Sequence, residues 1–388
     1  MPSSALHDAM AARVDRGEFP GIVTVAAGDD DVRIDAIGVT RFGGDVPMHR
    51  ETPFRIASMT KPIAAAAAMM LAEDDVIDLE EPVHRLLPEL AEPRVLVRPD
   101  ADLDDTVPAD RPITVEDLLT FRFGWGYPGD PQIMKTLPVS RRCDELGLAT
   151  GPPEPRTRLD PDEWIRRFGT LPLLFQPGER WLYDTPTHVL GVLLARAAGQ
   201  PLGDLLAERI FQPLGMTNTG FWLSPERAAQ LPGQYMTDSA TGQMTENTLT
   251  GPDVWTQPPV FPSASGGLVS TADDMLAFAQ MLLAKGVYGG TRLLSEKSVE
   301  QMTTNHLTPE QIAGGGVLLN GSGWGFGMGV TVGPDDIADS AGRYGWTGGY
   351  GTDWFNDPGE RVIGIALCQV TDFLWTGAMT EFAKLAYR

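Results

Sequence analysis

The sequence has few cysteines, histidines and lysines, and it lacks long apolar runs. Its only cysteines, Cys143 and Cys368, are far apart, which excludes a disulfide framework. The five histidines show no His-Glu-x-x-His pattern or other metal-ligand spacing, so we expect no metal and no cofactor. No segment approaches about 18 uninterrupted apolar residues, and the first 19 residues resemble an amphipathic helix rather than a signal peptide. We therefore predict a cytoplasmic protein without a membrane span.

Negative charge dominates the composition. The 388 residues include 30 basic and 52 acidic ones, which gives a net charge of −22 and a pI near 4.5. Such a field repels nucleic acids and anionic membranes, so we expect neither as a partner. With 42% hydrophobic residues, the chain can form a large core, and we expect two lobes. The composition leaves a homo-oligomer open.

The most informative pattern is Ser58-Met59-Thr60-Lys61, which stands just before the alanine-rich run at residues 62–71. That run predicts a buried helix whose first turn begins near Ser58. Positions i and i+3 share one face of a helix, so Lys61 would hold its amine beside the Ser58 hydroxyl. Burial favours the neutral amine, which can take a proton from serine and activate it as a nucleophile. Taken alone, the short pattern is equally compatible with a serine N-cap followed by a chance lysine.

Hydrophobic patterns along the chain predict an α+β fold in which helices flank a central antiparallel sheet. The middle of the chain is rich in proline and short helical patterns and has no sustained strand alternation. We therefore expect an α/β domain formed by residues 1–82 and 263–388, and a mainly helical domain formed by residues 83–262. The predicted helices are residues 1–19, 62–71, 114–119, 189–198, 275–285 and 372–387, and the predicted strands are 21–27, 31–37, 323–330, 344–350, 354–355 and 362–370.

Two further segments offer groups that a serine–lysine pair requires. Such a pair needs another group to relay the proton, and hydrogen-bond donors for an oxyanion. Tyr183 lies between a Gln-Pro-Gly turn and a predicted helix, where a side chain can point into a cleft, although most single tyrosines are structural. Residues 344–351 interleave aromatic residues with glycines. This pattern predicts either a strand that a ligand approaches closely or a strand with a bulge.

In this order, Ser58-x-x-Lys61, Tyr183 and Trp346-Thr347-Gly348 resemble the motifs of the serine β-lactamase/penicillin-binding-protein superfamily. In particular, the chain resembles the family VIII carboxylesterases, which share the class C β-lactamase fold. The resemblance extends from about residue 10 to residue 385 and implies a β-lactamase-like fold. Further segments that resemble the family are residues 54–62, 118–120, 175–183, 199–202, 212–216, 265–274 and 323–327.

The resemblance implies a role for each matching residue. Ser58 would be the nucleophile, and Lys61 and Tyr183 would share the general-base work, with Tyr183 returning the proton to the leaving alcohol. The backbone N–H groups of Ser58 and Gly349 would form the oxyanion hole. The residues expected to bind substrate in an aromatic cleft are Tyr127, Trp346, Gly348, Phe121 and Trp125, together with Trp255.

Three departures from the family pattern concern substrate binding. Class C β-lactamases have Tyr-x-Asn, whose amide holds the side chain of the β-lactam, whereas this chain has Tyr183-Asp184-Thr185. Their third motif begins with a cation, but Trp346 stands there and cannot bind a carboxylate. Phe121 replaces the usual histidine of the Leu-Leu-Thr-His-Thr-Ser-Gly turn. These changes weaken penicillin recognition and leave the acylation residues intact.

We therefore expect a serine carboxylesterase that cleaves small, neutral esters through a covalent acyl-enzyme on Ser58. Hydrolysis of amides or lactams, as in β-lactamases and D-aminopeptidases, and acyl transfer use the same residues and stay open. A non-catalytic binding relative is a remote alternative, because Ser58, Lys61 and Tyr183 are all retained. No Gly-x-Ser-x-Gly elbow occurs, which argues against an α/β-hydrolase. If Lys61 must be neutral to act, activity should rise with pH.

Overall fold

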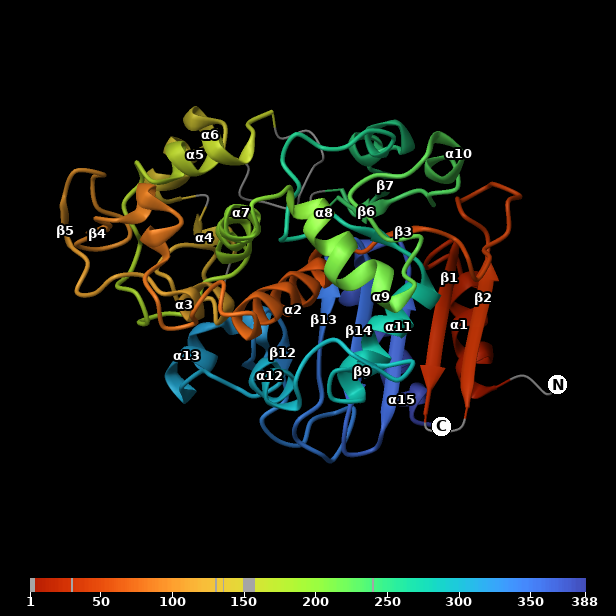
Figure 1. The fold of residues 1–388 in the computed structure, drawn as a ribbon. Coiled ribbons are helices and arrows are strands. Elements are labelled where there is room, and N and C mark those ends of the chain that lie inside the picture. Colours follow the sequence, from red (N-terminus) through yellow and green to blue (C-terminus); the bar gives the residue numbers. More distant parts are fainter. Residues whose placement is uncertain (1–3, 29–30, 130, 135, 149–157, 239–240) are drawn as a thin grey trace.

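An antiparallel sheet forms the centre of the molecule (Figure 1). The computed structural model describes residues 4–28, 31–129, 131–134, 136–148, 158–238 and 241–388. In this part of the chain the sheet has seven strands in the order β11 (Gly323–Trp324), β12 (Gly329–Val330), β13 (Tyr344–Gly348), β14 (Thr352–Asp357), β15 (Val362–Leu367), β1 (Gly21–Ala27) and β2 (Val32–Gly38). The predicted α+β fold with a central antiparallel sheet is thus confirmed.

The two ends of the chain meet in this sheet. Strand β1 pairs with β2 on one side and with β15 on the other, with Val23 opposite both Ala36 and Leu367. Side chains alternate between the two faces of a strand. Accordingly, Val23 and Val25 belong to the main core, and Ile22 belongs to a second core beneath α1 (Ala5–Asp15) and α15 (Ala378–Ala386). β1 is buried throughout because both of its faces are covered.

Helix α2 (Thr60–Glu73) lies between the sheet and the helical part of the chain (Figure 1). It packs against α7 (Thr185–Ala198), while α11 (Ala272–Leu283) covers one face of the sheet. Residues 60–71 are all buried, so the alanine-rich composition allows close contact on every side of α2. The 3-10 turn η1 (Ala57–Met59) precedes α2 and contacts β13.

The remaining elements include short helices and two-stranded ribbons. Between residues 83 and 262 the described chain has more residues in helices than in strands, and the predicted helical domain with boundaries at residues 82 and 262 stays a prediction. The other helices are α3 (Val115–Leu119), α4 (Pro131–Met134), α5 (Pro138–Leu146), α6 (Pro161–Phe168), α8 (Leu202–Leu206), α9 (Gln212–Leu214), α10 (Pro225–Ala228), α12 (Glu296–Met302), α13 (Pro309–Gly314) and α14 (Gly316–Leu319). The other strands are β3 (Phe54–Arg55), β4 (Arg94–Leu96), β5 (Thr106–Pro108), β6 (Tyr235–Thr237), β7 (Met244–Glu246), β8 (Val269–Ser270), β9 (Val287–Tyr288) and β10 (Thr291–Arg292).

Two sequence predictions about elements are wrong in detail. Residues 323–330 form two short strands, β11 and β12, because the chain reverses at Gly327, whose φ is 71°. The expected closing helix at residues 372–387 is divided into a 3-10 turn, η7 (Thr371–Leu374), and α15, with Gly377 at φ 80° between them. Asp29 and Asp30, between the predicted strands at residues 21–27 and 31–37, lie outside the described residues.

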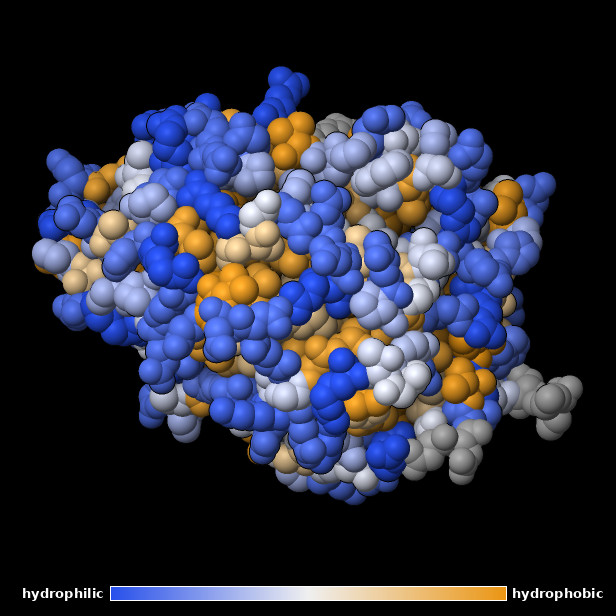
Figure 2. Space-filling model, viewed as in Figure 1, coloured by the Kyte–Doolittle hydropathy of each residue, from blue (hydrophilic) through white to orange (hydrophobic). Residues whose placement is uncertain are grey.

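The surface agrees with the strongly acidic composition. On the face shown in Figure 2, hydrophilic residues predominate and smaller hydrophobic areas lie between them. Within the described residues, no single helix is long and apolar enough to cross a membrane. One pair of helices, Thr185–Ala198 and Leu202–Leu214, has together the length and apolar composition of a membrane span, but the two helices are bent by 79° relative to each other.

Candidate active site

Ser58 lies in the turn η1 at the start of α2, as the sequence predicted. The preceding residue, Ala57, has a φ of 44°, a conformation that costs energy for any residue with a Cβ atom. The carbonyl oxygen of Ile56 holds this turn by accepting hydrogen bonds from Met59 N at 3.1 Å and Thr352 Oγ1 at 3.2 Å. The half-buried Ser58 is therefore presented on a strained turn that β14 supports.

Lys61 is fully buried and brings its amine to Ser58. Its Nζ lies 2.9 Å from Ser58 Oγ, 2.9 Å from Asp184 Oδ1 and 2.7 Å from the carbonyl oxygen of Ser265. The i, i+3 spacing thus produces the predicted contact between serine and lysine. The carboxylate of Asp184, which pairs with this amine, was not expected.

Tyr183 approaches the same amine from the turn that precedes α7. Its ring centroid lies 4.6 Å from Lys61 Nζ, and its backbone pairs with Tyr127 through hydrogen bonds of 2.9 and 2.7 Å. Residues 183–185 form a γ-turn, in which Thr185 N donates to Tyr183 O at 3.1 Å and Asp184 has φ 77° and ψ −65°. This turn is a rare and strained conformation. It directs both the Tyr183 and the Asp184 side chains toward α2.

Trp346 contacts Tyr183 directly. Its indole Nε1 donates a hydrogen bond of 2.6 Å to Tyr183 Oη, and its ring packs edge-on against Trp324 at 4.6 Å. The sequence predicted a substrate-binding role for Trp346 and missed this bond. Both Trp346 and Tyr183 are half-buried, so a substrate can reach them, and the binding role stays a prediction.

The glycines after Trp346 allow β13 to approach the Ser58 turn. A Cβ atom on Gly348 would collide with Ile56 O and Thr352 Oγ1. Gly349 is exposed in the following turn, and its carbonyl oxygen accepts a hydrogen bond of 3.0 Å from Thr371 Oγ1. The structure thus brings the Gly348–Gly349 segment close to the residues beside Ser58. The oxyanion hole formed by Ser58 and Gly349 remains a prediction.

The aromatic residues near Tyr183 form a cluster in which Phe121 is central. Phe121 is fully buried and lies 4.6 Å from Trp324, 5.9 Å from Tyr183 and 6.2 Å from Trp181, measured between ring centroids. Its φ of 62° is strained for a residue with a large side chain. Phe121 therefore supports Tyr183 and Trp324 from behind and does not itself form an open pocket wall, which corrects the sequence prediction.

The predictions for Trp125 and Trp255 are wrong. Trp125 is fully buried and packs edge-on against Phe168 at 5.4 Å, inside the main core. Trp255 is also fully buried and lies 5.9 Å from the guanidinium of Arg55. A bulky apolar side chain gains more from the core than from a cleft, and the sequence does not distinguish these two locations.

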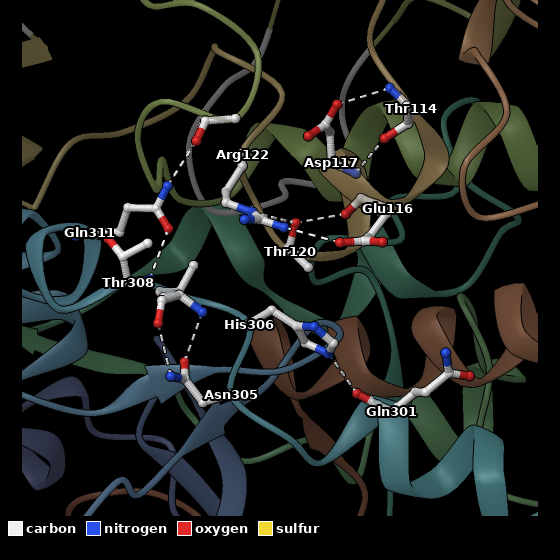
Figure 3. Close-up of polar contacts among 12 residues, drawn as sticks. Thr114, Glu116, Asp117, Thr120, Arg122, Gln301, Asn305, His306, Thr308 and Gln311 are labelled. Atoms are coloured by element: carbon white, nitrogen blue, oxygen red, sulfur yellow. Dashed lines mark hydrogen bonds and ion pairs between the residues drawn. The ribbon is translucent and has the colours of Figure 1, made fainter.

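Polar contacts fix the segments behind the aromatic cluster (Figure 3). Arg122 donates to Glu116 Oε1 at 3.1 Å and to Thr120 Oγ1 at 3.0 Å, which holds the turn around Phe121. Thr308 and Gln311 form a capping box at α13, and Gln311 Nε2 also donates to Gly178 O at 2.8 Å. These contacts link α3 and α13 to the loop that leads to Tyr183.

Sequence reasoning missed a buried polar network behind Lys61. Ser265 Oγ donates to Asp184 Oδ1, while Asp184 Oδ2 lies 3.4 Å from His188 Nε2. His188 Nδ1 lies 3.2 Å from Ser263 Oγ. Burial alone would raise the pKa of the Asp184 carboxyl, but Lys61, His188 and Ser265 outweigh burial and hold this pKa well below its usual range. The sequence contained one signal of this network: Asp184 and His188 are four residues apart, a spacing that places two side chains on the same face of a helix.

Two cavities lie beside the candidate site, and neither is lined by Ser58 or Lys61. One, of about 830 Å³, is mainly apolar and lies along α7 and α8. The other, of about 610 Å³, lies along β13 and β14 and is lined in part by Asp353, whose pKa burial raises to about 7. Among the described residues, no group of three or more His, Cys, Asp or Glu side chains is arranged to hold a metal ion.

Comparison with known proteins adds independent information. The Beta-lactamase family profile matches residues 6–384. Protein Rv1367c of Mycobacterium tuberculosis is 37% identical over 364 residues, which cover 92% of this chain and 87% of that protein. Esterase EstB of Burkholderia gladioli is 32% identical over 349 residues, which cover 85% of this chain and 80% of EstB.

A solved structure agrees with these matches over the whole fold. EstCE1, described as a hydrolase with promiscuous acyltransferase activity, superposes with a TM-score of 0.79 at 26% identity and covers 99% of this chain and 97% of its own. The predicted β-lactamase-like fold and the resemblance to family VIII esterases are therefore confirmed. The chain belongs to the beta-lactamase family, as a serine hydrolase of the serine β-lactamase/penicillin-binding-protein superfamily.

Proposed function

We propose that the chain is a carboxylesterase that forms a covalent acyl-enzyme on Ser58. The observation that carries this proposal is the 2.9 Å contact between Ser58 Oγ and the buried Nζ of Lys61. A nucleophile within hydrogen-bond reach of a base that is itself oriented by a third group is typical of covalent catalysis. The relation to EstB and EstCE1 supports an ester as the substrate.

In the acylation step, Ser58 Oγ attacks the ester carbonyl carbon and loses its proton to Lys61 or Tyr183. The backbone N–H groups of Ser58 and Gly349 stabilise the negative charge that develops on the carbonyl oxygen. The bond to the alkoxy oxygen then breaks, and Tyr183 gives the proton to the departing alcohol. Trp346 assists by donating its indole N–H to Tyr183 Oη at 2.6 Å, which stabilises negative charge on that oxygen.

In the second step, water replaces the alcohol and releases the acid. Lys61 or Tyr183 takes a proton from the water as it attacks the acyl carbon; the bond from this carbon to Ser58 Oγ then breaks, and the proton returns to Ser58 Oγ. The neutral indole of Trp346 provides no charge for a substrate carboxylate. The half-buried rings of Tyr183 and Trp346 offer an apolar environment, so small neutral esters are the favoured substrates.

The direct test compares the unmodified protein with Ser58→Ala on p-nitrophenyl butyrate and on a chromogenic cephalosporin. Rapid ester cleavage that Ser58→Ala abolishes, with slow cephalosporin cleavage, is the expected result. Ser340→Ala is the matched control, because Ser340 donates its hydroxyl to Asp357, far from the site. Faster cleavage of the cephalosporin than of the ester would replace the esterase proposal with a β-lactamase. Full ester cleavage by Ser58→Ala would remove Ser58 as the nucleophile.

Acyl transfer is a second candidate function, favoured by the apolar cluster beside Tyr183 and by the relation to EstCE1. An apolar alcohol that binds against these rings would compete with water for the acyl-enzyme. The test adds benzyl alcohol to the p-nitrophenyl butyrate assay and measures benzyl butyrate by chromatography. Transfer is supported if the new ester forms faster than butyric acid at low alcohol concentration. Butyric acid as the sole product would leave hydrolysis as the function.

A further inference from the structure

The side chain of Asp184 does not cap the helix that follows it, α7. Asp184 is the N-cap residue of α7, where an aspartate side chain normally accepts a hydrogen bond from the first turn of the helix. Its side chain makes no such bond here and points instead toward Lys61 and Ser265. The backbone of Asp184, strained at a φ of 77°, gives the side chain this orientation. This arrangement indicates that the carboxylate acts on the lysine.

The hydrogen-bond partners of Lys61 determine how its amine faces Ser58. The carbonyl oxygen of Ser265 and the carboxylate of Asp184 can only accept hydrogen bonds, so Nζ must donate one hydrogen to each. A neutral amine has two hydrogens and one lone pair. With these two positions engaged, the remaining position at Nζ faces Ser58 Oγ, 2.9 Å away, and a neutral amine has its lone pair there. An ammonium ion in the same position would donate its third hydrogen to Ser58.

We propose that Asp184 is a positioning residue that completes a Ser58–Lys61–Asp184 relay. This inference rests on the proposed role of Ser58 as the nucleophile. When Ser58 Oγ forms its bond to the carbonyl carbon, the hydroxyl proton moves to the Lys61 lone pair and the carbonyl π electrons move to the oxygen. The resulting ammonium ion faces the Asp184 carboxylate, which stabilises it as the carboxylate of a serine–histidine–aspartate triad stabilises imidazolium. Tyr183 then carries the proton to the leaving oxygen.

His188 lies beside the other oxygen of the carboxylate. The imidazole is buried between Trp164 at 5.8 Å and Phe261 at 5.9 Å, and its Nε2 lies 3.4 Å from Asp184 Oδ2. Within the described residues, neither of these two atoms has a hydrogen-bond partner.

The groups that face this relay come from three segments, and few of them are charged. Lys61 comes from α2, Asp184 and His188 come from α7, and the neutral Ser263 and Ser265 come from the loop before β8. Tyr183 contributes its ring face. Within the described part of the chain, Asp184 is the one anionic partner of the Lys61 amine, so loss of the Asp184 charge should affect Lys61 strongly.

The test follows Lys61 directly by NMR, with lysine labelled at ¹³Cε and ¹⁵Nζ. The chain has five lysines, so the spectrum is simple, and Lys61→Met identifies the signal of Lys61. Asp184→Asn keeps an oxygen acceptor for Lys61 but removes the charge. We expect the Lys61 signal to convert to that of a neutral amine at a pH about one to three units lower in Asp184→Asn than in the unmodified protein. Conversion at the same pH in both proteins would overturn the proposal.

Kinetics provide a second readout that a merely structural role would not change. The rising limb of the pH profile of kcat/KM should move to lower pH in Asp184→Asn, and the plateau should fall by roughly 10-fold or more because the base is weaker. Asp117→Asn is the matched control, since Asp117 is a buried, ion-paired carboxylate at α3, away from Lys61. An unshifted limb in Asp184→Asn would contradict the relay. Asp184→Ser is the second variant if Asp184→Asn does not fold.

The two proposals fail in different ways. The NMR titration reports the charge of Lys61 whether or not any ester is hydrolysed. An inactive protein whose Lys61 signal responds to Asp184→Asn would reject the esterase function and leave the interaction between Asp184 and Lys61 supported. An active esterase without this response would reject the relay and keep the function.

Discussion

At the scale of single residues, the site is organised around two oxygen atoms, Ser58 Oγ and Tyr183 Oη. Lys61 Nζ lies 2.9 Å from Ser58 Oγ, and Trp346 Nε1 donates a hydrogen bond of 2.6 Å to Tyr183 Oη. The amine is fully buried and engaged with Asp184, and the indole is neutral, so neither group offers a free charge to a substrate carboxylate. This distribution favours a substrate without a carboxylate.

The indole N–H of Trp346 can be tested by Trp346→Phe, which keeps an aromatic ring and removes the donor. We expect kcat to fall roughly 10- to 100-fold with a smaller change in KM, because a hydrogen bond to a charged oxygen is worth about 1.5–3 kcal/mol. Steady-state kinetics on p-nitrophenyl butyrate measure this effect. Trp125→Phe is the control, since Trp125 Nε1 has no hydrogen-bond partner among the described residues and lies in the core. Equal kinetics for both variants would remove the Trp346 bond from the mechanism.

Asp353 gives a prediction about stability and pH. It is 7% exposed on β14, and burial raises the pKa of its carboxyl to about 7, above the usual value, although Arg343 lowers this pKa in part. Between about pH 4 and pH 7 the folded protein keeps a proton that the unfolded chain has lost. Stability should therefore fall by about 1.4 kcal/mol per pH unit over this interval through this group.

Asp353→Asn removes this pH-dependent cost. Relative to the unmodified protein, the variant should gain up to about 4 kcal/mol in the free energy of unfolding between pH 4 and pH 8. Urea denaturation at both pH values measures the difference. Asp335→Asn is a comparison: burial raises the pKa of the Asp335 carboxyl, but Arg343 outweighs burial and holds this pKa below the usual value, so this carboxyl is ionised in both the folded and the unfolded chain and its effect should not change between pH 4 and pH 8. A pH-independent effect of Asp353→Asn would show that Asp353 is ionised in the folded protein at pH 4 and above.

At the scale of elements, the site depends on how closely β13 approaches η1. Gly348 has no side chain, and Ile56 O and Thr352 Oγ1 occupy the space that a Cβ atom would need. The same Ile56 oxygen holds the Ser58 turn. The strand that carries Trp346 therefore packs directly against the turn that carries Ser58, with Ile56 O at the contact.

Gly348→Ala should separate these two elements. We expect a loss of about 1–3 kcal/mol in stability, as for other overpacked sites, and a decrease in kcat/KM of more than 10-fold. Thermal denaturation and ester kinetics are the measurements. Gly333→Ala is the control, because no atom lies within 4 Å of the added Cβ position and its φ is not in the left-handed region. Unchanged kinetics in a folded Gly348→Ala protein would show that the site tolerates a displacement of β13.

At the scale of the whole molecule, the fold connects segments from both ends of the chain around α2. Strand β1 pairs with β15, so the sheet is complete only when the C-terminal strands have joined the N-terminal hairpin. The site draws Ser58, Tyr183 and Trp346 from separate parts of the sequence. All of these parts lie within a molecule with a formal net charge of −22.

This net charge predicts that salt affects charged and neutral substrates differently. Screening should raise kcat/KM several-fold for mono-p-nitrophenyl succinate, an anionic ester, between about 10 mM and 500 mM sodium chloride. The value for p-nitrophenyl butyrate should change little over the same range. Initial rates at low substrate concentration give both values. An equal response of the two esters would show that the molecular charge does not control access to the site.

The sequence by itself determined the contacts that depend on local geometry. The spacing of Ser58 and Lys61 specifies one helix face, and Thr114 with Asp117 specifies a capping box, which α3 contains. The order of strands in a sheet is not local, but the alternation of apolar residues was sufficient to predict an antiparallel arrangement. Domain boundaries stay a prediction.

Only the tertiary structure decided the burial and the partners of the other side chains. Trp125 and Trp346 are both tryptophans beside glycines, yet one packs in the core and the other bonds to Tyr183. The contact of Asp184 with Lys61 joins residues 123 positions apart and requires a strained γ-turn. Such contacts depend on how α2, α7 and the sheet pack together, because burial and long-range approach are properties of the folded chain and not of any short segment.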